Sequence, residues 1–254
     1  MSSQFADLDF EGFKALARDP SLSANEKVGF PDSYRAGKEK AILRDIAGKL
    51  TNLGRLGRLG RKGRSVVDIG PGCSAVATSL IDLCRRRGHL LTLIDSAEML
   101  ALLPDDPAVA KIAGRFPEDC GGFLAAHRGL FDAILVYSVL QYVFAEGNVF
   151  AFLDRSLELL ADGGQLLIGD IPNQSMRKRF FSAESGVRFH RRFTGAGEPP
   201  SVEHNVLEPG KIDDAVVLAL VLRARAAGFH AYLLPQAPAL PMANRREDLL
   251  IVKP

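Results

Sequence analysis

Residues 66–74 read VVDIGPGCS, an apolar run that leads into an acid and two glycines one residue apart. Glycine lets the backbone turn tightly and lie close to a ligand, and a helix that follows presents free N–H groups at its start. A strand, a glycine turn and a helix in this order are typical of nucleotide-binding sheets. The third glycine of the dinucleotide fingerprint is missing, because Ala75 and Val76 stand near its place, so other residues must decide which ligand the turn holds.

Short β-type runs alternate with helical segments around and after this turn. The runs expected to form strands are 65–70, 90–95, 109–114, 131–138 and 165–172, and helices are expected over 74–88, 96–103 and 148–164. A long helix within 209–229 and two final runs, 230–236 and 247–254, complete the chain, and the two runs can pair as an antiparallel edge. This alternation predicts βαβ units, hence an α/β fold with a doubly wound, mostly parallel sheet.

The chain divides into an N-terminal arm, residues 1–64, and a Rossmann-like domain, residues 65–254. Within the arm we expect a loose segment over 1–35, an amphipathic helix over 36–50 and a basic, glycine-rich linker over 52–64. Within the domain, 173–208 lacks a clear period and is expected to be an irregular insertion or lid.

Composition describes an ordinary globular protein with 47% apolar residues and 24% charged residues, whose formal net charge of +2 gives no global reason to expect nucleic acid. The three cysteines, Cys73, Cys84 and Cys120, lack the short paired spacing of a zinc or disulfide framework and are expected to be buried thiols in a reducing compartment. The first residues lack the features of a secretory signal, and the longest apolar run, 215–222, is far shorter than the roughly 18 residues that a membrane span needs. A cytoplasmic protein without a membrane partner is expected.

Two acids narrow the ligand of the glycine turn. Asp68 stands two residues before the first glycine, where it would repel a pyrophosphate but would suit a ligand with an ammonium group, such as S-adenosylmethionine. Asp95 ends the next strand, 27 residues later, where a carboxylate can accept both hydrogen bonds of a ribose diol. A nicotinamide-dependent oxidoreductase is therefore disfavoured.

With these motifs the chain resembles the class I S-adenosylmethionine-dependent methyltransferases, from about Ser65 to the C-terminus. VVDIGPGCS looks like the first family motif, IDSAEML like the ribose-binding second, and FDAILVYSVLQYV like the fourth strand and its helix. LLADGGQLLIGD is similar to the fifth-strand region, and EDLLIVKP to the last strand of the antiparallel pair. The resemblance implies a seven-stranded sheet in the order 3-2-1-4-5-7-6 with an antiparallel C-terminal edge strand.

The resemblance also implies a set of cofactor-binding positions. Asp68 would lie near the methionine ammonium, Asp95 would hold the ribose hydroxyls, and the family's Gly-Asp after the third strand is here Gly114 followed by Arg115 and Phe116, which would replace the adenine contact. The full set is Asp68, Gly70, Pro71, Gly72, Asp95, Ser96, Met99, Gly114, Arg115, Phe116, Tyr137 and Ser138. No metal ion is expected.

The candidates for chemistry lie past the later strand ends. Asp170, at the end of LLIGD, and His190 are the candidate catalytic residues; His204 is a weaker candidate, and His89 and His127 are expected to be exposed on the opposite edge. A general base matters only where the acceptor must lose a proton, and adds about 10² to 10⁴ in rate.

The stretch 176–193 interleaves six basic residues with four phenylalanines. It can be a solvated face anchored by its rings, or a lid whose Arg188 and Arg191 hold a phosphate or carboxylate of the acceptor. Tyr34 and Arg35, just before the helix of the arm, are placed to close the site and, in the case of Tyr34, to contact the acceptor.

The sequence thus predicts a methyltransferase that acts on a small-molecule or saccharide-like acceptor, most simply at oxygen. One alternative is a non-catalytic S-adenosylmethionine-binding or degenerate methyltransferase-like subunit. A second is an RNA methyltransferase, since the basic tract 55–64 keeps nucleic acid open as a partner. The sequence does not indicate an oligomeric state.

Overall fold

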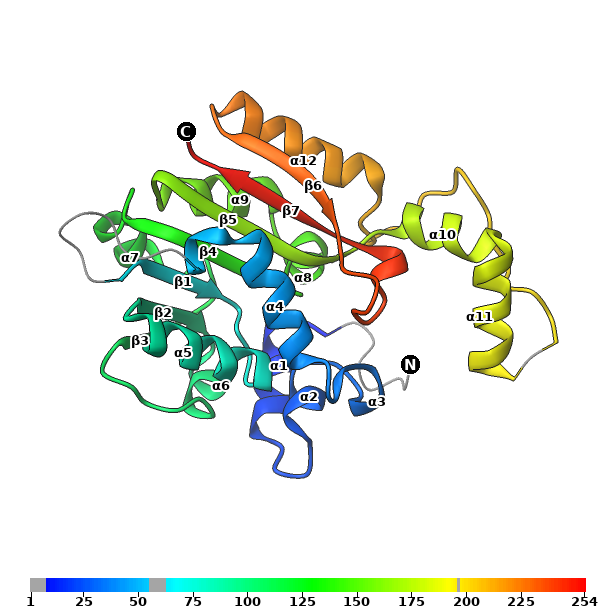
Figure 1. The fold of residues 1–254 in the computed structure, drawn as a ribbon, viewed down its shortest axis with the longest axis horizontal. Helices are drawn as coiled ribbons and strands as arrows, with labels where there is room; N and C mark the ends of the chain where they lie inside the picture. The colour runs from blue at the N-terminus through cyan, green and yellow to red at the C-terminus, as the bar shows by residue number, and fades with distance from the viewer. Residues whose placement is uncertain (1–7, 55–62, 196) are drawn as a thin grey trace.

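The computed structural model describes residues 8–54, 63–195 and 197–254, and these form a seven-stranded sheet in the order β3-β2-β1-β4-β5-β7-β6 (Figure 1). The strands are β1 Ser65–Ile69, β2 Leu90–Asp95, β3 Val109–Ala113, β4 Phe131–Tyr137, β5 Leu160–Pro172, β6 His230–Pro235 and β7 Arg246–Val252. β1 to β5 are parallel, whereas β7 runs antiparallel to both β5 and β6. The strand order and the antiparallel edge that the resemblance implies are both confirmed.

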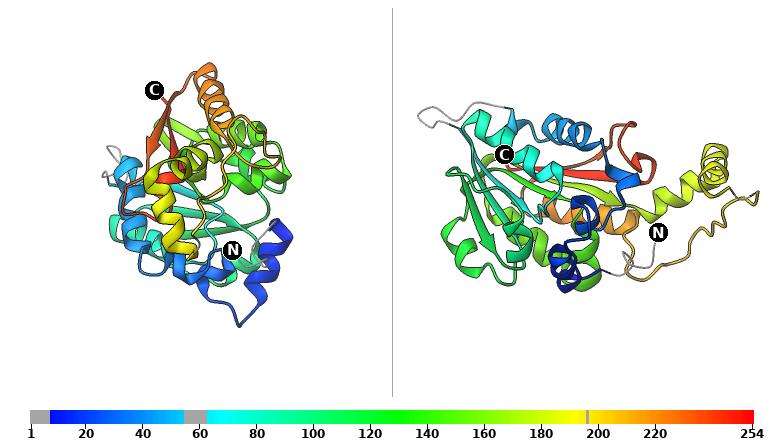
Figure 2. Two further views of the ribbon diagram at one scale, coloured as in Figure 1. Left: turned by 90° about the vertical axis from the view of Figure 1, so that its right-hand side faces the viewer. Right: turned by 90° about the horizontal axis from the view of Figure 1, so that it is seen from below.

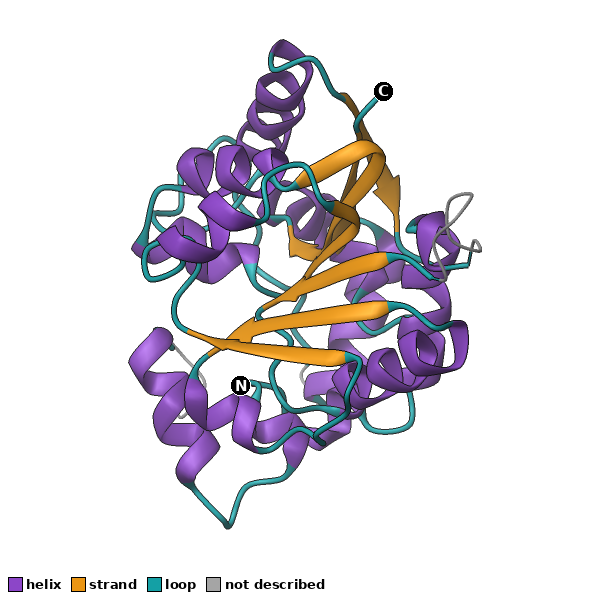
Figure 3. Cartoon of the chain, turned by 90° about the vertical axis from the view of Figure 1, so that its left-hand side faces the viewer, coloured by secondary structure: helices purple, strands orange, loops and turns teal. Residues whose placement is uncertain are grey.

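Helices cover both faces of this sheet (Figure 3). Those of the domain are α5 Ala75–Arg87, α6 Ala97–Ala101, α7 Gly121–Ala126, α8 Leu140–Glu146, α9 Val149–Glu158 and α12 Asp214–Ala226. The predicted helix over 148–164 is too long: it ends at Glu158, and β5 already begins at Leu160, which pairs with Phe131 of β4.

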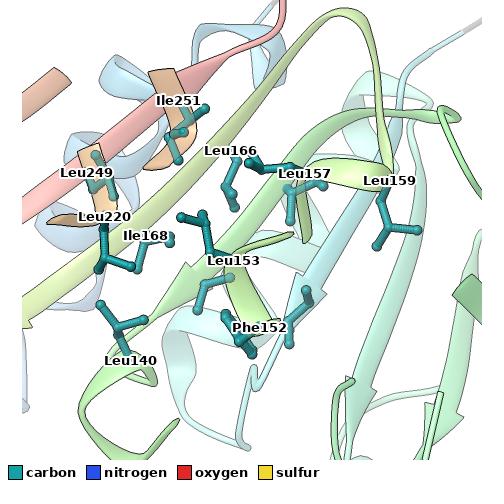
Figure 4. Packing of buried hydrophobic residues seen from close by; sticks show 14 of the residues in the cluster. Leu140, Phe152, Leu153, Leu157, Leu159, Leu166, Ile168, Leu220, Leu249 and Ile251 are labelled. Atoms are coloured by element: carbon teal, nitrogen blue, oxygen red, sulfur yellow. The ribbon is translucent and has the colours of Figure 1, made fainter. Parts of the chain in front are cut away.

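Two apolar clusters fill the space between the sheet and these helices. On one face α8, α9 and α12 pack against β4, β5 and β7, and Figure 4 shows this cluster with Phe152 and Leu153 at its centre. On the other face, Ile42 and Ile46 of α4 (Glu39–Lys49) join Leu80 of α5 over β1 and β2. The amphipathic helix expected over 36–50 is therefore present and completes the core. Cys73, Cys84 and Cys120 are buried free thiols, as expected.

The first part of the N-terminal arm is more ordered than the sequence suggests. In place of a loose segment it folds into three short helices, α1 Phe10–Arg18, α2 Ala24–Lys27 and α3 Asp32–Arg35. Side-chain caps start the first two, because Asp9 accepts from the Gly12 amide, and Ser23 with Glu26 forms a capping box. The buried ammonium of Lys27 donates to the Ala17 carbonyl at 2.7 Å and so ties α2 to the end of α1. α2 and α3 have four residues each, too few to show a helical period in the sequence.

The linker of the arm is packed at both described ends. It opens with η2 Thr51–Leu53, whose Asn52 and Leu53 are buried, while 55–62, which carries most of the predicted basic linker, lies outside the described residues. The expectation that His89 is exposed is wrong: its Nδ1 accepts from the Arg64 amide at 3.0 Å, and its Nε2 lies 3.0 Å from the Leu53 carbonyl oxygen. A fully buried imidazole thus joins the two described ends of the linker; His127 is half-buried.

Residues 173–194 are not irregular, in contrast to the prediction. They form α10 Gln174–Ser182 and α11 Glu184–Thr194, which extend beyond the end of the sheet (Figure 2). The ring of Phe189 lies 5.8 Å from that of Phe180 and 5.9 Å from that of Phe193, centroid to centroid, so aromatic side chains hold the two helices together. The prediction overlooked the helical period of this stretch, in which Phe189 and Phe193 are four residues apart and lie on one face of α11. Residues 197–208 form a loop with bends and one turn, and contain neither helix nor strand.

Candidate functional site

A cavity lies at the edge of the sheet where the carboxyl ends of β1, β2 and β4 meet, which is where open α/β sheets bind ligands. The N-terminal arm, the loop after β3 and residues of α8 and α9 form the rest of its wall. Of the residues predicted from sequence, the cavity is lined by Gly70, Pro71, Gly72, Asp95, Met99, Gly114, Arg115, Phe116, Tyr137 and Ser138. The structure thus brings ten of these positions, spread over 69 residues of chain, around one space.

The glycine turn has the backbone that its sequence predicts. Gly70 and Gly72 have φ angles of 73° and 60°, in the left-handed region that favours glycine. A Cβ at Gly72 would lie 2.4 Å from Val28 of the arm, so the turn and the arm are in close contact. The turn is fastened to β2 because Asp95 Oδ2 accepts from the Gly72 amide at 2.9 Å. Ser74 stands at the N-cap of α5, but its side chain makes no capping hydrogen bond there.

Two acids lie beneath the turn and differ in exposure to the cavity. Asp95 lines it, and burial raises the pKa of this carboxyl from 3.8 to about 6, although the amides of Gly72 and Ser96 act in the opposite direction. Asp68 is buried behind the cavity wall, where burial and the neighbouring Asp95 raise its pKa to about 8. Ser96 also lies behind the wall, where its hydroxyl accepts from the Met99 amide and caps α6. Two carboxyl groups are therefore buried under one end of the cavity, and at neutral pH Asp95 carries the negative charge there, because Asp68 is largely protonated.

Arg115, which replaces the expected acid after β3, does not leave an unpaired cation in the cavity. Its Nη2 lies 3.2 Å from Glu146 Oε2, and its backbone N–H donates to Asp119 Oδ2 at 2.9 Å. Phe116 beside it packs edge-on against Phe152, with ring centroids 5.4 Å apart. These residues give this end of the cavity a flat apolar wall and a neutralised polar rim.

At the opposite end, the strand ends of β4 and β5 meet a side chain of the arm. Ser138 and Asp170 have φ angles of 62° and 60°, a conformation that non-glycine residues rarely adopt and that is frequent at functional sites. Arg35 Nη2 donates to Ser138 Oγ at 2.6 Å and lies 3.3 Å from Asp170 Oδ2, and Ser138 donates to the same carboxylate. Arg246 Nη1 donates to Asp170 Oδ2 at 2.7 Å. Arg35 and Ser138 line the cavity, whereas Asp170 lies behind them.

The other sequence-predicted residues lie away from the cavity wall. His190 is on α11, where its ring faces Phe181, and Arg188 forms an ion pair with Glu184. Arg191 is exposed on the same helix. Tyr34 packs against Phe193 of α11, with ring centroids 6.2 Å apart, and thereby joins the arm to the α10–α11 hairpin.

Sequence reasoning missed the apolar lining that the arm supplies. Phe10, Phe13, Val28 and Phe30 all line the cavity, and Phe13 lies edge-on to Tyr142 of α8 at 4.8 Å between ring centroids. The contact between Phe13 and Tyr142 joins segments more than a hundred residues apart in sequence, and no local pattern in the arm predicts it. Among the described residues, no group of three or more His, Cys, Asp or Glu side chains is arranged to hold a metal ion.

Comparisons with known proteins agree with the fold. No family model and no curated protein matches the chain. Among solved structures, a chain of the complex between the Haloferax volcanii Trm112 methyltransferase activator and the putative methyltransferase is 14% identical, with a TM-score of 0.52 over 95% of this chain and 97% of that one.

Two further solved structures are similar. The plantazolicin methyltransferase BpumL, in complex with a monoazolic desmethylPZN analog and SAH, is 13% identical, with a TM-score of 0.56 over 96% of each chain. The CurJ carbon methyltransferase is 14% identical, with a TM-score of 0.56 over 87% of this chain and 56% of that one. At such identities the likeness is one of fold. The chain has the Rossmann-like fold of the class I S-adenosylmethionine-dependent methyltransferases.

Proposed function

We propose that this protein is an S-adenosylmethionine-dependent methyltransferase that methylates a small-molecule or saccharide-like acceptor, at an oxygen atom. The observation that carries the proposal is the cavity itself. It runs from Asp95, at the end of β2, to Ser138, at the end of β4, and the arm closes it on the side away from the sheet.

The residues of the cavity fit the proposed cofactor. Asp95 keeps a free lone pair on each oxygen after accepting from the two backbone amides, so it can also accept from two ribose hydroxyls. Met99 and Phe116 supply apolar walls on which an adenine ring can lie. The positive φ angles of Gly70 and Gly72 keep side chains out of the space beside the turn. Asp68 stays the predicted neighbour of the methionine ammonium; its pKa of about 8 leaves it largely protonated in the ligand-free chain, and a bound cation would favour its ionised form.

When bound, S-adenosylmethionine supplies a methyl group on a sulfonium, which is already activated for transfer. The task left to the protein is to hold the acceptor oxygen in line with this group and to exclude water. Such positioning can lower a barrier by roughly 7 to 11 kcal/mol. We assign exclusion of water to the arm, because Phe10, Phe13 and Phe30 cover the cavity and Arg35 seals its end.

Proton transfer, in this proposal, passes through Ser138. Ser138 lines the cavity, and its hydroxyl donates to Asp170, which the guanidinium groups of Arg35 and Arg246 hold in place. An acceptor hydroxyl that donates to Ser138 Oγ would have a route to the Asp170 carboxylate. Asp170 therefore stays the proposed base, acting through Ser138, whereas His190 would reach an acceptor only if the acceptor extends toward α11.

The test is methyl transfer from S-adenosylmethionine labelled in the methyl group to a panel of sugar nucleotides and phosphorylated metabolites. The proposal expects label in at least one hydroxyl-bearing acceptor, and expects Ser138→Ala to lower the rate by about 10² or more because the proton route is lost. Transfer of label to nitrogen or carbon alone would overturn the assignment to oxygen.

A second candidate function is binding of S-adenosylmethionine without catalysis. It is favoured by one observation, that neither Asp170 nor His190 lines the cavity. This candidate expects binding of SAH with no labelled product from any acceptor. The remaining alternative, an RNA substrate, depends on the basic tract 55–64, of which 55–62 lie outside the described residues.

A cytoplasmic location is part of the proposal and is supported by three buried thiols that form no disulfide. Within the described ranges, none of the helices combines the length and apolar character needed to traverse a bilayer.

A further inference from the structure

A group of guanidinium side chains lies next to the Arg35 end of the cavity. The turn η3 Ala243–Arg245 leads into β7, so Arg245 and Arg246 are adjacent at the start of that strand. Arg246 Cζ lies 5.7 Å from the Phe30 ring centroid and Arg35 Cζ lies 4.0 Å from the same centroid. Because Phe30 and Arg35 line the cavity, this group is continuous with the proposed methyl-transfer site.

The Arg245 side chain rests on an aromatic base made by the α10–α11 hairpin. Its Cζ lies 5.8 Å from the Phe181 centroid and 5.7 Å from the Phe189 centroid. Arg177 of α10 lies over the same Phe181 ring, with Cζ 5.1 Å from the centroid. Cation–π contacts of this kind orient guanidinium groups but leave their N–H donors available along the edge. We call Arg177, Arg245 and Arg246 the arginine cluster.

Positive charge in this cluster exceeds the negative charge that faces it. Arg246 shares one carboxylate oxygen, Asp170 Oδ2, with Arg35. For Arg245 and Arg177 the described residues provide no carboxylate within ion-pair distance. Among those residues, the side chain that accepts a hydrogen bond from Arg245 is the neutral Asn244 amide, at 3.2 Å. Burial, together with the nearby charges of Arg246 and Arg177, lowers the pKa of Arg245, whereas Tyr34 acts in the opposite direction. The repulsion between these like charges, two of them half-buried and that of Arg177 exposed, is relieved by an anion.

We propose that the arginine cluster binds an oxyanion, carboxylate or phosphate, on the acceptor substrate, with Arg245 as the main contact. The planar fork of a guanidinium matches both groups and can donate two parallel hydrogen bonds to either. That the oxyanion belongs to a methyl acceptor rests on the proposed function; that an oxyanion binds here does not.

This assignment replaces the arginines of α11 that the sequence singles out. Arg188 is already paired with Glu184, and Arg191 is exposed, so neither is held in a fixed orientation next to the cavity. Arg245 comes from the other end of the chain and is positioned by the rings of α10 and α11. In this proposal the aromatic residues of α10 and α11 position Arg245, and the exposed Arg188 and Arg191 of α11 do not contact the oxyanion.

The test uses phenyl phosphate and benzoate as probes, with uncharged benzyl alcohol as the neutral comparison, in calorimetric titrations of the full chain at low ionic strength. Both anions are expected to bind and benzyl alcohol is not. Arg245→Gln is expected to weaken binding of the preferred anion by about tenfold or more, as expected for loss of a charged hydrogen-bond donor. Arg192→Gln, which removes an exposed guanidinium from α11, is the matched control and should leave the affinity unchanged.

The two anions also distinguish the source of the oxyanion. Tighter binding of phenyl phosphate identifies a phosphorylated acceptor, and tighter binding of benzoate identifies a carboxylic acid. If neither anion binds, or if Arg245→Gln and Arg192→Gln weaken binding equally, the proposal is wrong. If Arg245→Gln fails to fold, the exposed Arg177→Gln gives the same test, with a smaller but measurable loss expected.

A titration with SAH on the same variants separates this inference from the proposed function. Arg245 does not line the cavity, so Arg245→Gln should bind SAH as the parent chain does. Anion binding without SAH binding would support the oxyanion site at the arginine cluster and contradict the proposed methyltransferase function. SAH binding without anion binding would support the proposed cofactor and contradict the oxyanion site.

Discussion

The two ends of the site differ in charge, although both lie at the same edge of one sheet. Under the glycine turn lie two buried carboxyl groups, of which Asp95, with a pKa of about 6, is ionised at neutral pH, whereas Asp68, with a pKa of about 8, is largely protonated. Beyond Ser138, Arg35 and the arginine cluster concentrate positive charge. A cationic donor and an anionic acceptor would each lie at the end that attracts it. This difference in charge between the two ends would orient the two ligands so that their reacting atoms meet in the middle of the cavity.

The acidic end should make the protein more stable at low pH than at high pH. The pKa of Asp68 is about 8 and that of Asp95 about 6 in the folded chain, against 3.8 ordinarily, so the folded state holds these protons more tightly than the unfolded state. Their contribution to stability is complete below pH 3.8 and is lost as the pH rises through about 6 and then about 8. Chemical unfolding of the ligand-free chain should show a fall on the order of a few kcal/mol across this range.

Asp68→Asn isolates the acid that contributes most to that slope. It should flatten the dependence between about pH 6 and 8 and raise stability at pH 8, since the buried negative charge is gone. Asp105→Asn changes a carboxyl that is 97% exposed and should leave the slope intact. A parallel pH dependence in the parent chain and in Asp68→Asn would contradict the account of the acidic end.

The basic end depends on Arg35, which crosses from the arm to the strand ends. Arg35→Met leaves Ser138 without its donor and Asp170 with Arg246 as its one guanidinium partner. A loss of about 2 to 4 kcal/mol in the free energy of unfolding is expected, as for other broken buried ion pairs. Denaturant titration measures it, and the exposed Arg44→Met of α4 serves as the control. Equal stability of the two variants would show that the arm is not fastened through Arg35.

Asp95→Ala should affect binding at the acidic end alone. Removing the carboxylate leaves the Gly72 and Ser96 amides without their acceptor and deletes the proposed ribose contacts. We expect SAH affinity to fall by about 1 to 3 kcal/mol, while the phenyl phosphate affinity stays constant. An unchanged SAH affinity would mean that the end of β2 does not hold the ribose.

The smallest expected effect is that of salt. The arginine cluster is partly open to solvent, so raising ionic strength from about 0.01 to 0.15 M should weaken phenyl phosphate binding several-fold through screening. SAH binding in the cavity should change much less. If the affinities of both ligands depend equally on salt, the proposed difference in charge between the two ends of the site is wrong.

Sequence alone predicted the acidic end well because that end is local. The strand, the glycine turn and the acid that closes the next strand follow one another within 30 residues, and periodicity locates the strands around them. The complete strand order came from the resemblance to a known family.

The basic end was largely hidden from sequence reasoning. Arg35 and Ser138 meet across 103 positions, and Arg245 lies on aromatic rings of two helices that the sequence analysis did not predict. The prediction that His89 is exposed was wrong for a related reason. Its two backbone partners, Leu53 and Arg64, precede it in the chain and lie on either side of the linker. Long-range contacts, rather than local propensities, set these positions.

The most direct test of the central claim is a calorimetric titration of the ligand-free chain with SAH and, separately, with NAD. The fold, the missing third glycine and the buried Asp68 predict one SAH bound per chain and no measurable binding of NAD. Binding of NAD without binding of SAH would contradict the assignment of the cavity to S-adenosylmethionine.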